Sequence, residues 1–318
     1  MHQKIKIALL MGGLSAERKI SFASGQAILK NLDKNKYHVY PIKINPNLKF
    51  ISQLFNLRKG IDLAFIALHG PFGEDGKIQA LLEILRIPYT FSGALASALA
   101  MSKLKSRQLF SANWRTKIKV PKYLAITKQE WQKNKRVICS QIIKKIKLPC
   151  VVKPDTSGSS YGINIVWTKS GLEKSLKNAF NFDGLILIEE YLGKKEISVP
   201  TIGNERPAAL PVIEIIPPNE FFDLQAKYSG QSREICPAQI GPKLTRQAQK
   251  IAIKVHQIMG ARGIIRTDMM IKNNRIYVLE TNTIPGLTAE SLVPKSAAVV
   301  GITFSKLLDK IIELALKK

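Results

Sequence analysis

The sequence predicts an α/β protein of two or three domains, with a parallel sheet in its first third and a small α+β unit in its middle. The 318 residues are too many for one small domain. Strands and helices alternate in the first third, whereas the middle third follows the order strand, helix, strand, strand, helix, strand. With 45% hydrophobic and 23% charged residues, the chain can bury several cores, which argues against wholesale disorder.

The first third carries three stretches with the composition of buried strands, KIALLMG, YHVYPIKI and LAFIALHG, alternating with the helical patterns SFASGQAILKNL and KIQALLEILR. This alternation predicts a parallel sheet, with functional loops at the C-terminal ends of its strands. The polar loops GGLSAERK and HGPFGEDG occur at such ends. Taken alone, His69 is better explained as a packed side chain, and Glu17 as a first-turn acid that complements the helix dipole.

The middle third predicts an antiparallel sheet built from KVPKYLAI, PCVVKP, INIVWT and LILIEEYL. Thr127 and Glu130 form a T-x-x-E capping box that begins one long helix, KQEWQKNKRVICSQIIKKI. Ser170 and Glu173 are expected to cap a second helix, LEKSLKNAF.

The last third begins with a hairpin, ISVPTIGNERPAALPVIEII, which is expected to turn at Gly203-Asn204. The polar stretch 217–242 is too long for an ordinary connection, which indicates a functional loop. A helix, TRQAQKIAIKVHQIMG, precedes two strands joined at Asn273-Asn274, and the chain closes with the amphipathic helix FSKLLDKIIELALKK.

The net charge of +26 raises the question of a nucleic-acid partner. The basic residues are mostly Lys, spread over the whole chain, with no Arg-rich arm and no alternation with aromatic residues. Solvated faces with a basic composition are therefore the favoured explanation, and tight binding of duplex DNA at physiological salt would overturn it.

Cysteine usage and hydropathy favour a cytoplasmic protein without a membrane partner. No apolar run approaches the length that spans a bilayer. The N-terminal KIKIALLMGG superficially suggests a signal peptide, but its apolar part is short and the charged SAERK follows at once, so a first buried strand is preferred. Cys139, Cys150 and Cys236 are odd in number and unclustered, which argues against a disulfide framework or a zinc site and for a reducing compartment.

A carboxylate and an amide stand side by side at the end of the strand RIYVLE, because Glu280 and Asn282 are two residues apart. Pairing across the Asn-Asn turn brings Asp268 close to Glu280. Three hard oxygen ligands suit Mg²⁺, which takes its remaining ligands from water and substrate phosphates. Arg266 points to the same face as Asp268 and is placed to hold a developing negative charge. A hairpin with exposed polar residues is the simpler explanation for one acid, but not for three converging ligands.

The loop KPDTSGSSYG lies between two expected strands, and its backbone N–H groups can turn toward phosphate oxygens. Lys153 supplies a point charge at its start. The loop is no Walker A motif, because the G-x-x-x-x-G-K-[ST] pattern is missing, and a flexible hairpin remains the alternative. Glu189, at the end of the last middle strand, is by itself a weak sign of nucleotide contacts.

Several strings occur together in one order: GGLSAER, LHGPFGEDG, SGALASALAMSK, KPDTSGSSYG, QAKYSG and RTDMM…LETNTIPGLTAESLVP. Together they resemble the signatures of the D-alanine–D-alanine ligases, which are ATP-grasp enzymes, over essentially the whole chain. The resemblance implies an N-terminal Rossmann-like domain at 1–101, a small central ATP-grasp domain at 102–192 and a C-terminal ATP-grasp domain at 193–318. It also implies that the segment 217–242 is a lid.

The resemblance implies ATP as a substrate and two Mg²⁺ or Mn²⁺ ions. The metal ligands that it implies are Asp268, Glu280 and Asn282. The ATP-binding residues that it implies are Lys103, Lys153, Ser159, Ser160, Glu189, Leu192 and Glu196.

For the reaction itself, the resemblance implies that Glu17 binds the amino group of the first D-alanine, with His69 nearby. Ser159 and Tyr228 would complete a hydrogen-bonded set with Glu17 that closes the lid. Arg266 and the Gly286 N–H would form an oxyanion hole, and the carboxylate of the second D-alanine would be bound by Ser291 and Leu292. The expected product is D-alanyl-D-alanine, formed through a D-alanyl phosphate for peptidoglycan synthesis, by an enzyme expected to be a homodimer.

Some positions depart from the expected pattern. Tyr161 is bulkier than expected in the loop KPDTSGSSYG, called the phosphate loop below. Ser102 replaces an acid before Lys103, and Phe91 is large where a small residue is expected. Gln225 stands where many relatives have Glu, and Tyr228 favours D-alanine over D-lactate as the second substrate. These departures put details of nucleotide and lid contacts in question rather than the activity.

Three alternatives remain open at this stage. The first is a D-alanine–D-lactate or D-alanine–D-serine ligase with the same fold. The second is a catalytically silent ATP-grasp scaffold that binds nucleotide or nucleic acid, against which every expected metal, lysine and arginine position is filled. The third is another carboxylate–amine ligase of the glutathione synthetase type, against which GGLSAER and LTAESLVP count.

Overall fold

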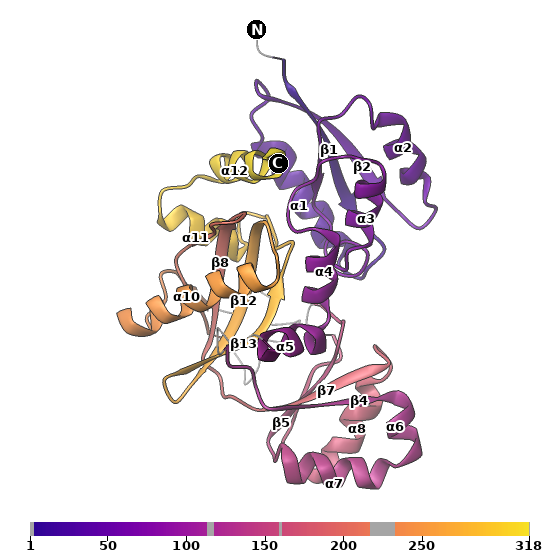
Figure 1. The fold of residues 1–318 in the computed structure, drawn as a ribbon, viewed down its shortest axis with the longest axis vertical. Helices are drawn as coiled ribbons and strands as arrows, with labels where there is room; N and C mark the ends of the chain where they lie inside the picture. The colour runs from indigo at the N-terminus through magenta and orange to yellow at the C-terminus, as the bar shows by residue number, and fades with distance from the viewer. Residues whose placement is uncertain (1–2, 113–117, 159–160, 217–232, 318) are drawn as a thin grey trace.

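The computed structural model describes residues 3–112, 118–158, 161–216 and 233–317. These residues form three sheets with helices packed around them (Figure 1). In Figure 1 the N-terminal sheet lies at the top and the small middle unit at the bottom, with its helices farthest from the other two sheets. Among the described residues, none of the helices is both long enough and apolar enough to span a lipid bilayer.

The N-terminal sheet is parallel, as predicted, with the order β2-β1-β3. Its strands are β1 Ile5–Gly12, β2 Tyr37–Ile44 and β3 Leu63–Ile66. Its helices are α1 Arg18–Asn31, α2 Lys49–Leu57 and α3 Lys77–Ile84. Strand β3 is shorter than the eight residues expected, because the chain leaves the sheet after Ile66 and turns at Gly70, where φ is +71°. This early exit frees His69 to face a cavity instead of a neighbouring strand.

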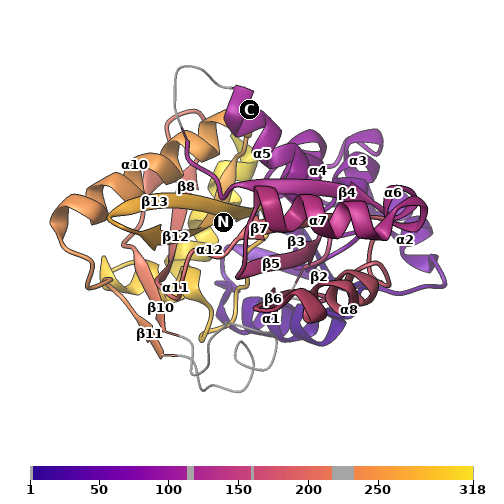
Figure 2. The ribbon, with the colours of Figure 1, turned by 90° about the horizontal axis from the view of Figure 1, so that it is seen from below.

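The middle sheet is antiparallel with the order β4-β7-β5-β6, again as predicted. Its strands are β4 Tyr123–Thr127, β5 Cys150–Pro154, β6 Asn164–Val166 and β7 Leu185–Glu190. Its helices are α6 Lys128–Lys133, α7 Lys135–Lys145 and α8 Lys169–Ala179. Figure 2, seen from below, shows this unit in front of the N-terminal domain, with the sheet that contains β8 and β12 to its left.

Two local predictions for the middle unit need correction. The capping box at Thr127 and Glu130 is present, but the single long helix is wrong, because Asn134 adopts φ −154° and divides it into α6 and α7. The cap expected at Ser170 is also wrong. Thr168 begins α8, and its Oγ1 accepts a hydrogen bond from the Gly171 N–H at 3.3 Å. Thr168 has the extended backbone that an N-cap requires, whereas Ser170 already lies inside the first turn.

The C-terminal sheet has the order β11-β10-β8-β12-β13, with β9 paired to β8. Its strands are β8 Glu196–Gly203, β9 Ala208–Ala209, β10 Ile213–Ile216, β11 Arg233–Ile235, β12 Gly263–Lys272 and β13 Arg275–Asn282. Asn273 and Asn274 have φ of +50° and +55°, the pair of left-handed residues that closes a tight hairpin. The segment 217–242 is not wholly a loop, because β11 pairs with β10. Residues 217–232 lie outside the described part.

Three further helices complete this part: α10 Pro242–Ile258, α11 Leu292–Val299 and α12 Phe304–Leu316. Helix α12 packs against α1 and β3, so the last helix completes the N-terminal core (Figure 1). Asp309 on α12 accepts hydrogen bonds from the Tyr37 hydroxyl at 2.8 Å and the Lys36 ammonium at 2.7 Å.

The remaining helices, α4 Ala94–Met101 and α5 Lys103–Ala112, connect the three parts. Helix α4 packs against α3 and β13, and α5 packs against α10 and β13. Phe110 of α5 belongs to the core under α10, whereas the start of α5 meets the middle unit. The domain limits 1–101, 102–192 and 193–318 stay predictions.

Candidate active site

A cavity of about 750 Å³ is lined by residues from all three parts of the fold. Of the residues expected to carry function, its lining includes Glu17, His69, Lys103, Arg266, Glu280, Asn282, Gly286, Ser291 and Leu292. Lys153, Glu189, Leu192, Glu196 and Asp268 do not line it. Ser159, Ser160, Tyr228 and Gln225 lie outside the described residues.

The Glu17 carboxylate sits where the loops after β1 and β3 approach the phosphate loop. A Cβ atom on Gly70 would collide with Glu17 Oε2, and one on Gly158 would lie 3.5 Å from Glu17 Oε1. Glycine at position 70 is therefore needed for this contact. Glu17 occupies the N-cap position of α1, yet its side chain does not cap the helix and faces the cavity instead.

His69 is buried and held by two hydrogen bonds. Its Nδ1 lies 3.2 Å from the Ile284 carbonyl oxygen, and its Nε2 lies 2.9 Å from Ser24 Oγ. Because a carbonyl oxygen only accepts, Nδ1 carries the proton and Nε2 accepts from Ser24. Burial, with a further effect of the Arg266 charge, lowers the pKa of His69 to about 4. His69 is therefore neutral at physiological pH and joins the N-terminal sheet to the loop after β13.

Glu74 also lines the cavity, and sequence reasoning did not single it out. Its Oε2 accepts a hydrogen bond from the Gly70 N–H at 2.9 Å, and its Oε1 has no hydrogen-bond partner among the described residues. Burial and the nearby Glu17 carboxylate raise the pKa of Glu74 to about 8. Its place in HGPFGEDG, after a buried strand, was the available signal. Two neighbouring carboxyl groups are suited to receive an ammonium group.

The expected metal ligands lie across the β12–β13 hairpin. Asp268 pairs with Glu280, and Arg266 pairs with Asn282, which confirms the proximity predicted from the Asn-Asn turn. Asp268 Oδ1 accepts from Ser198 Oγ at 2.6 Å, and Asn282 Oδ1 accepts from the Ile284 N–H at 3.0 Å.

Two carboxylates and an amide on facing strands fit the hard-oxygen chemistry of Mg²⁺ or Mn²⁺. Asp268 also accepts from Arg266, with Nε 2.9 Å from Oδ1 and Nη2 2.7 Å from Oδ2, which leaves about one of its four acceptor sites for a metal ion. No group of three or more His, Cys, Asp or Glu side chains placed to hold a metal occurs within the described ranges. The third expected ligand, Asn282, is an amide and falls outside that grouping.

Lys103 begins α5 and reaches into the cavity. Its Nζ donates to the Ser157 carbonyl oxygen at 2.8 Å and lies 3.6 Å from Glu280 Oε2. The ammonium is therefore placed between the phosphate loop and the β12–β13 hairpin, which suits a polyphosphate bound beside a metal ion.

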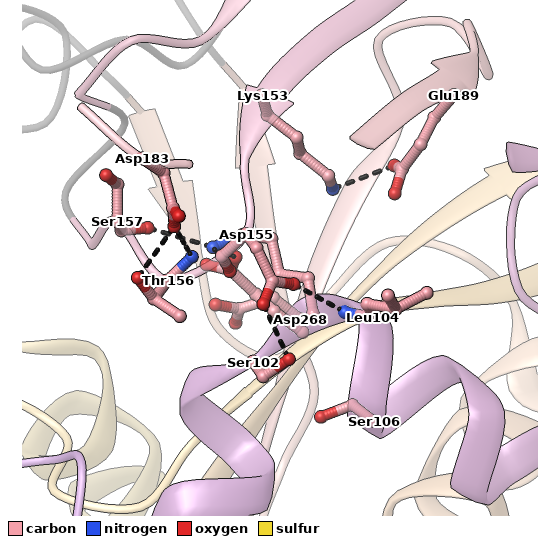
Figure 3. Close-up of polar contacts among 12 residues, drawn as sticks. Ser102, Leu104, Ser106, Lys153, Asp155, Thr156, Ser157, Asp183, Glu189 and Asp268 are labelled. Carbon is pink, nitrogen blue, oxygen red and sulfur yellow. Dashed lines mark hydrogen bonds and ion pairs between the residues drawn. The ribbon is translucent and has the colours of Figure 1, made fainter. Parts of the chain in front are cut away.

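Lys153 and Glu189 form a buried ion pair behind this corner, with Nζ 2.7 Å from Oε2 (Figure 3). Burial lowers the pKa of Lys153 to about 8, although the Glu189 charge opposes this. Arg107, which is almost fully buried, contacts the other oxygen of Glu189. Sequence reasoning missed Arg107, although its place one helical turn after Lys103 was an available signal. Leu192 is buried after β7, and Glu196 begins β8.

The far end of the cavity is formed by Gly286 and the N-terminus of α11. A Cβ atom on Gly286 would lie 2.9 Å from Ser291 Oγ, so glycine allows the two segments to touch. Ser291 Oγ also accepts from the Thr288 N–H at 3.0 Å. Ser291 is the N-cap residue of α11, and Leu292 is the first residue of that helix. A helix N-terminus with free N–H groups favours a carboxylate.

Two of the unexpected residues lie away from the cavity lining. Phe91 is buried in the N-terminal core, where its ring packs edge-on against Phe65 at 5.8 Å between centroids. The Tyr161 ring packs near Phe182, at 6.5 Å. Neither side chain belongs to the described cavity wall, so their bulk is accommodated elsewhere.

Comparisons with known proteins identify relatives of the whole chain. Residues 114–313 match the family described as D-ala D-ala ligase C-terminus, and residues 6–59 and 52–92 match D-ala D-ala ligase N-terminus. The chain is 44% identical over 318 residues to a D-alanine–D-alanine ligase of Syntrophobacter fumaroxidans, covering 99% of each chain.

Solved structures agree with these matches. A D-alanine–D-alanine ligase from Bacillus anthracis, crystallised in complex with ATP, is similar at a TM-score of 0.83 and 34% identity, over 98% of each chain. The VanG D-Ala:D-Ser ligase from Enterococcus faecalis is similar at a TM-score of 0.84 and 29% identity, covering 98% of this chain and 100% of that one. The fold is therefore an ATP-grasp architecture, and the chain belongs to the D-alanine–D-alanine ligase family.

Proposed function

We propose that this protein uses ATP to join two D-alanine molecules into D-alanyl-D-alanine, releasing ADP and phosphate. The observation that carries the proposal is the cavity itself. It is lined by an acidic corner at Glu17 and Glu74, a cationic corner at Lys103 and Arg266, and a helix N-terminus at Ser291. These suit an ammonium group, a phosphorylated carboxylate and a second carboxylate, in that order.

The first step activates a carboxylate, which by itself is a poor electrophile. The carboxylate oxygen of the first D-alanine attacks the γ-phosphorus of ATP, and ADP leaves, so that an acyl phosphate forms. Glu17, with Glu74 beside it, holds the amino group of this D-alanine. Lys103 and Lys153 balance the negative charge of the phosphates. Electrostatic stabilisation of this kind, together with positioning, accounts for most of the catalysis of phosphoryl transfer.

The second step forms the peptide bond. The amine of the second D-alanine attacks the acyl carbon, phosphate leaves with the bonding electrons, and the amine loses a proton. Arg266 and the Gly286 N–H hold the oxyanion that develops, and one such donor is typically worth ~3 kcal/mol of barrier. Ser291 and the first N–H groups of α11 orient the second carboxylate. The acyl phosphate hydrolyses readily, so the access of water to the cavity must be limited during the reaction.

Asp268, Glu280 and Asn282 are the residues that would hold Mg²⁺ or Mn²⁺ at this corner. Two such ions, when bound to these oxygens, would supply positive charge that polarises the ATP phosphates. Roles for Ser159, Ser160 and Tyr228 in phosphate binding and closure, for Leu192 and Glu196 in adenosine binding, and for a lid within 217–242 are part of the proposal.

Phosphate release from MgATP tests the proposal directly. The purified chain is given D-alanine, then L-alanine, then D-alanine with D-lactate or D-serine, and the products are identified by mass. Phosphate release with D-alanine alone, matched by D-alanyl-D-alanine, is the expected outcome. Release with L-alanine, or no release under any condition while MgATP still binds, would contradict it. The latter result would favour the silent scaffold.

The runner-up is a ligase that takes D-serine or D-lactate as its second substrate. The similarity to the VanG D-Ala:D-Ser ligase favours including D-serine in the assay. A product formed only when D-serine or D-lactate is added would keep the mechanism and change the second-substrate site around Ser291.

We further propose that the protein acts in the cytoplasm as a homodimer that supplies peptidoglycan synthesis, without a membrane or nucleic-acid partner. The role in peptidoglycan synthesis follows from the proposed product, and the homodimer is proposed from the family resemblance. Sedimentation at micromolar concentration tests the dimer. A gel shift at physiological salt tests whether the charge of +26 recruits nucleic acid.

A further inference from the structure

The carboxylate of Asp155 joins the phosphate loop to the first turn of α5 (Figure 3). Asp155 directly follows β5, is only 4% exposed, and accepts two hydrogen bonds from the start of α5. The Leu104 N–H donates to Oδ1 at 2.7 Å, and the Ser102 hydroxyl donates to Oδ2 at 2.7 Å. The first N–H groups of a helix have no partner within the helix, so Asp155 acts as a cap supplied from another part of the fold.

Lys103 is fixed by the same junction. Its N–H donates to the Asp155 carbonyl oxygen at 3.2 Å, and its Nζ donates to the Ser157 carbonyl oxygen at 2.8 Å. The Lys103 side chain therefore lies along the same loop whose Asp155 caps α5. A shift of α5 relative to the loop would move the ammonium relative to the phosphates it serves.

The opposite side of the loop is anchored separately. Asp183, in the loop before β7, accepts from the Thr156 N–H at 2.8 Å and from the Thr156 hydroxyl at 2.7 Å (Figure 3). The Asp155 N–H also donates to the Leu185 carbonyl oxygen at 3.0 Å, so both residues are held at the start of β7, but only the Asp155 carboxylate reaches α5. Asp155 is thus the member of this pair that carries the contact with α5.

We propose that Asp155 is a positioning residue for ATP, which locks the phosphate loop and Lys103 into one unit by capping α5 with its carboxylate. A carboxylate at a helix N-terminus is favoured by the helix dipole and by charge-assisted hydrogen bonds. Residue 102, where the sequence lacks the expected acid, is a serine whose hydroxyl contacts this carboxylate. The negative charge is therefore present at the start of α5, but it comes from the loop. The inference rests on the proposed function in taking ATP as the ligand.

The first test is Asp155→Asn, which keeps the shape and removes the charge. We expect the KM for ATP to rise about tenfold, the loss typical of one hydrogen bond to a charged group, with a smaller change in kcat. The KM for D-alanine should change by less than about twofold, because Glu17 is untouched. A role confined to folding would lower the active fraction, and hence kcat, without changing the KM for ATP.

The second test moves the carboxylate to the helix itself. Aspartate is a favoured N-cap residue, and Ser102 Oγ already accepts from the Lys105 N–H at 3.1 Å. Ser102→Asp alone should raise the KM for ATP, because it would place two carboxylates together. Combined with Asp155→Ser, it should return the KM to within about threefold of the wild type, a coupling that only interacting residues show.

Asp183→Asn is the matched control, because it loosens the same loop at a contact that does not involve α5. Ser102→Asp must not rescue this variant. Rescue of Asp183→Asn, an unchanged KM for ATP in Asp155→Asn, or no rescue in the double variant would each overturn the proposal. If Asp155→Asn does not fold, the double variant decides alone: a folded protein with a KM near the wild type supports the proposal, and an unfolded one overturns it.

Hydrogen exchange at the Leu104 amide separates this proposal from the proposed function. The amide should exchange slowly in the wild type, faster in Asp155→Asn, and slowly again in the double variant, without any substrate present. A wild type that makes no D-alanyl-D-alanine would refute the proposed function and leave this readout intact. Equal exchange in wild type and Asp155→Asn would refute the capping role whatever the activity.

Discussion

Arg266 donates two hydrogen bonds to the carboxylate of Asp268 on the same strand, with Nη2 2.7 Å from Oδ2 and Nε 2.9 Å from Oδ1. The two residues are two apart on β12, so the pleat presents both side chains on one face. Only Arg266 of the pair lines the cavity. The expected oxyanion donor is therefore oriented by an expected metal ligand, which couples the two halves of the site.

The first prediction is that Arg266→Ala lowers kcat by about 100- to 1,000-fold, the range seen when one oxyanion donor is removed. The dissociation constant of a non-reacting ATP analogue should change much less. Steady-state kinetics and calorimetric titration measure the two quantities. Arg275→Ala, an exposed arginine at the start of β13, is the control. Unchanged turnover in Arg266→Ala would remove it from the oxyanion role.

The second prediction concerns Glu74, whose pKa rises from 4.5 to about 8 through burial and the Glu17 charge. Because the folded state holds this proton more tightly, the stability it contributes is fully present below about pH 4.5 and is lost as the pH rises through 8. Glu74→Gln cannot ionise. Between pH 6 and pH 9 its free energy of unfolding should therefore fall by about 1–3 kcal/mol less than that of the wild type.

Urea unfolding at several pH values measures this difference. Glu205→Gln, an exposed glutamate, should keep the pH dependence of the wild type. Parallel curves for wild type and Glu74→Gln would show that the Glu74 proton is held no more tightly in the fold than outside it.

The third prediction concerns His69, whose pKa falls from 6.5 to about 4 because it is buried. Between these values the unfolded chain binds the proton and the folded state does not, so stability is present above about pH 6.5 and is lost toward pH 4. The loss for this histidine is about 3 kcal/mol at most. In NMR spectra, His69 should remain the neutral Nδ1–H tautomer at pH 6.

His69→Gln cannot titrate, yet its amide can donate to the Ile284 carbonyl oxygen as the ring does. Its stability should decline less than that of the wild type as the pH falls, while His38→Gln, at an exposed histidine, should follow the wild type. A wild-type His69 that titrates near pH 6.5 would contradict the expectation that burial disfavours its charged form.

The fourth prediction is that Gly286→Ala weakens the use of the second D-alanine. Its Cβ would lie 2.9 Å from Ser291 Oγ, so one of the two segments must move by part of an ångström. We expect kcat/KM for D-alanine to fall about 10- to 100-fold, since small displacements of positioning groups are costly. Gly60→Ala, where the added carbon meets nothing nearer than 3.6 Å, should behave like the wild type. Equal kinetics for both variants would mean that the Gly286–Ser291 contact is unimportant.

Features set by neighbouring residues were predictable from the sequence. The capping box at Thr127 depends on four consecutive residues, and the Asn273-Asn274 turn sets the register of the hairpin as far as Met269. A bulge between Asp268 and Met269 then shifts the register by one residue, and only this shift places Asp268 opposite Glu280. The break at Asn134 was not predicted, because the helical pattern continues on both sides of it. Caps and tight turns can be predicted from the types of neighbouring residues, whereas the backbone angle of one residue such as Asn134 cannot.

The sequence by itself determined the order of strands and helices, the parallel and antiparallel sheets, and the motifs that carry the family resemblance. Only the tertiary structure decided that Glu74 lies beside Glu17, that Arg107 contacts Glu189, and that Asp155 caps a helix 51 residues away from it in the chain. The physical reason is that periodicity and capping are local, whereas these contacts depend on how separate cores dock. Burial and charge at these contacts arise only when the separate parts pack together, so they cannot be predicted from any one segment of the sequence.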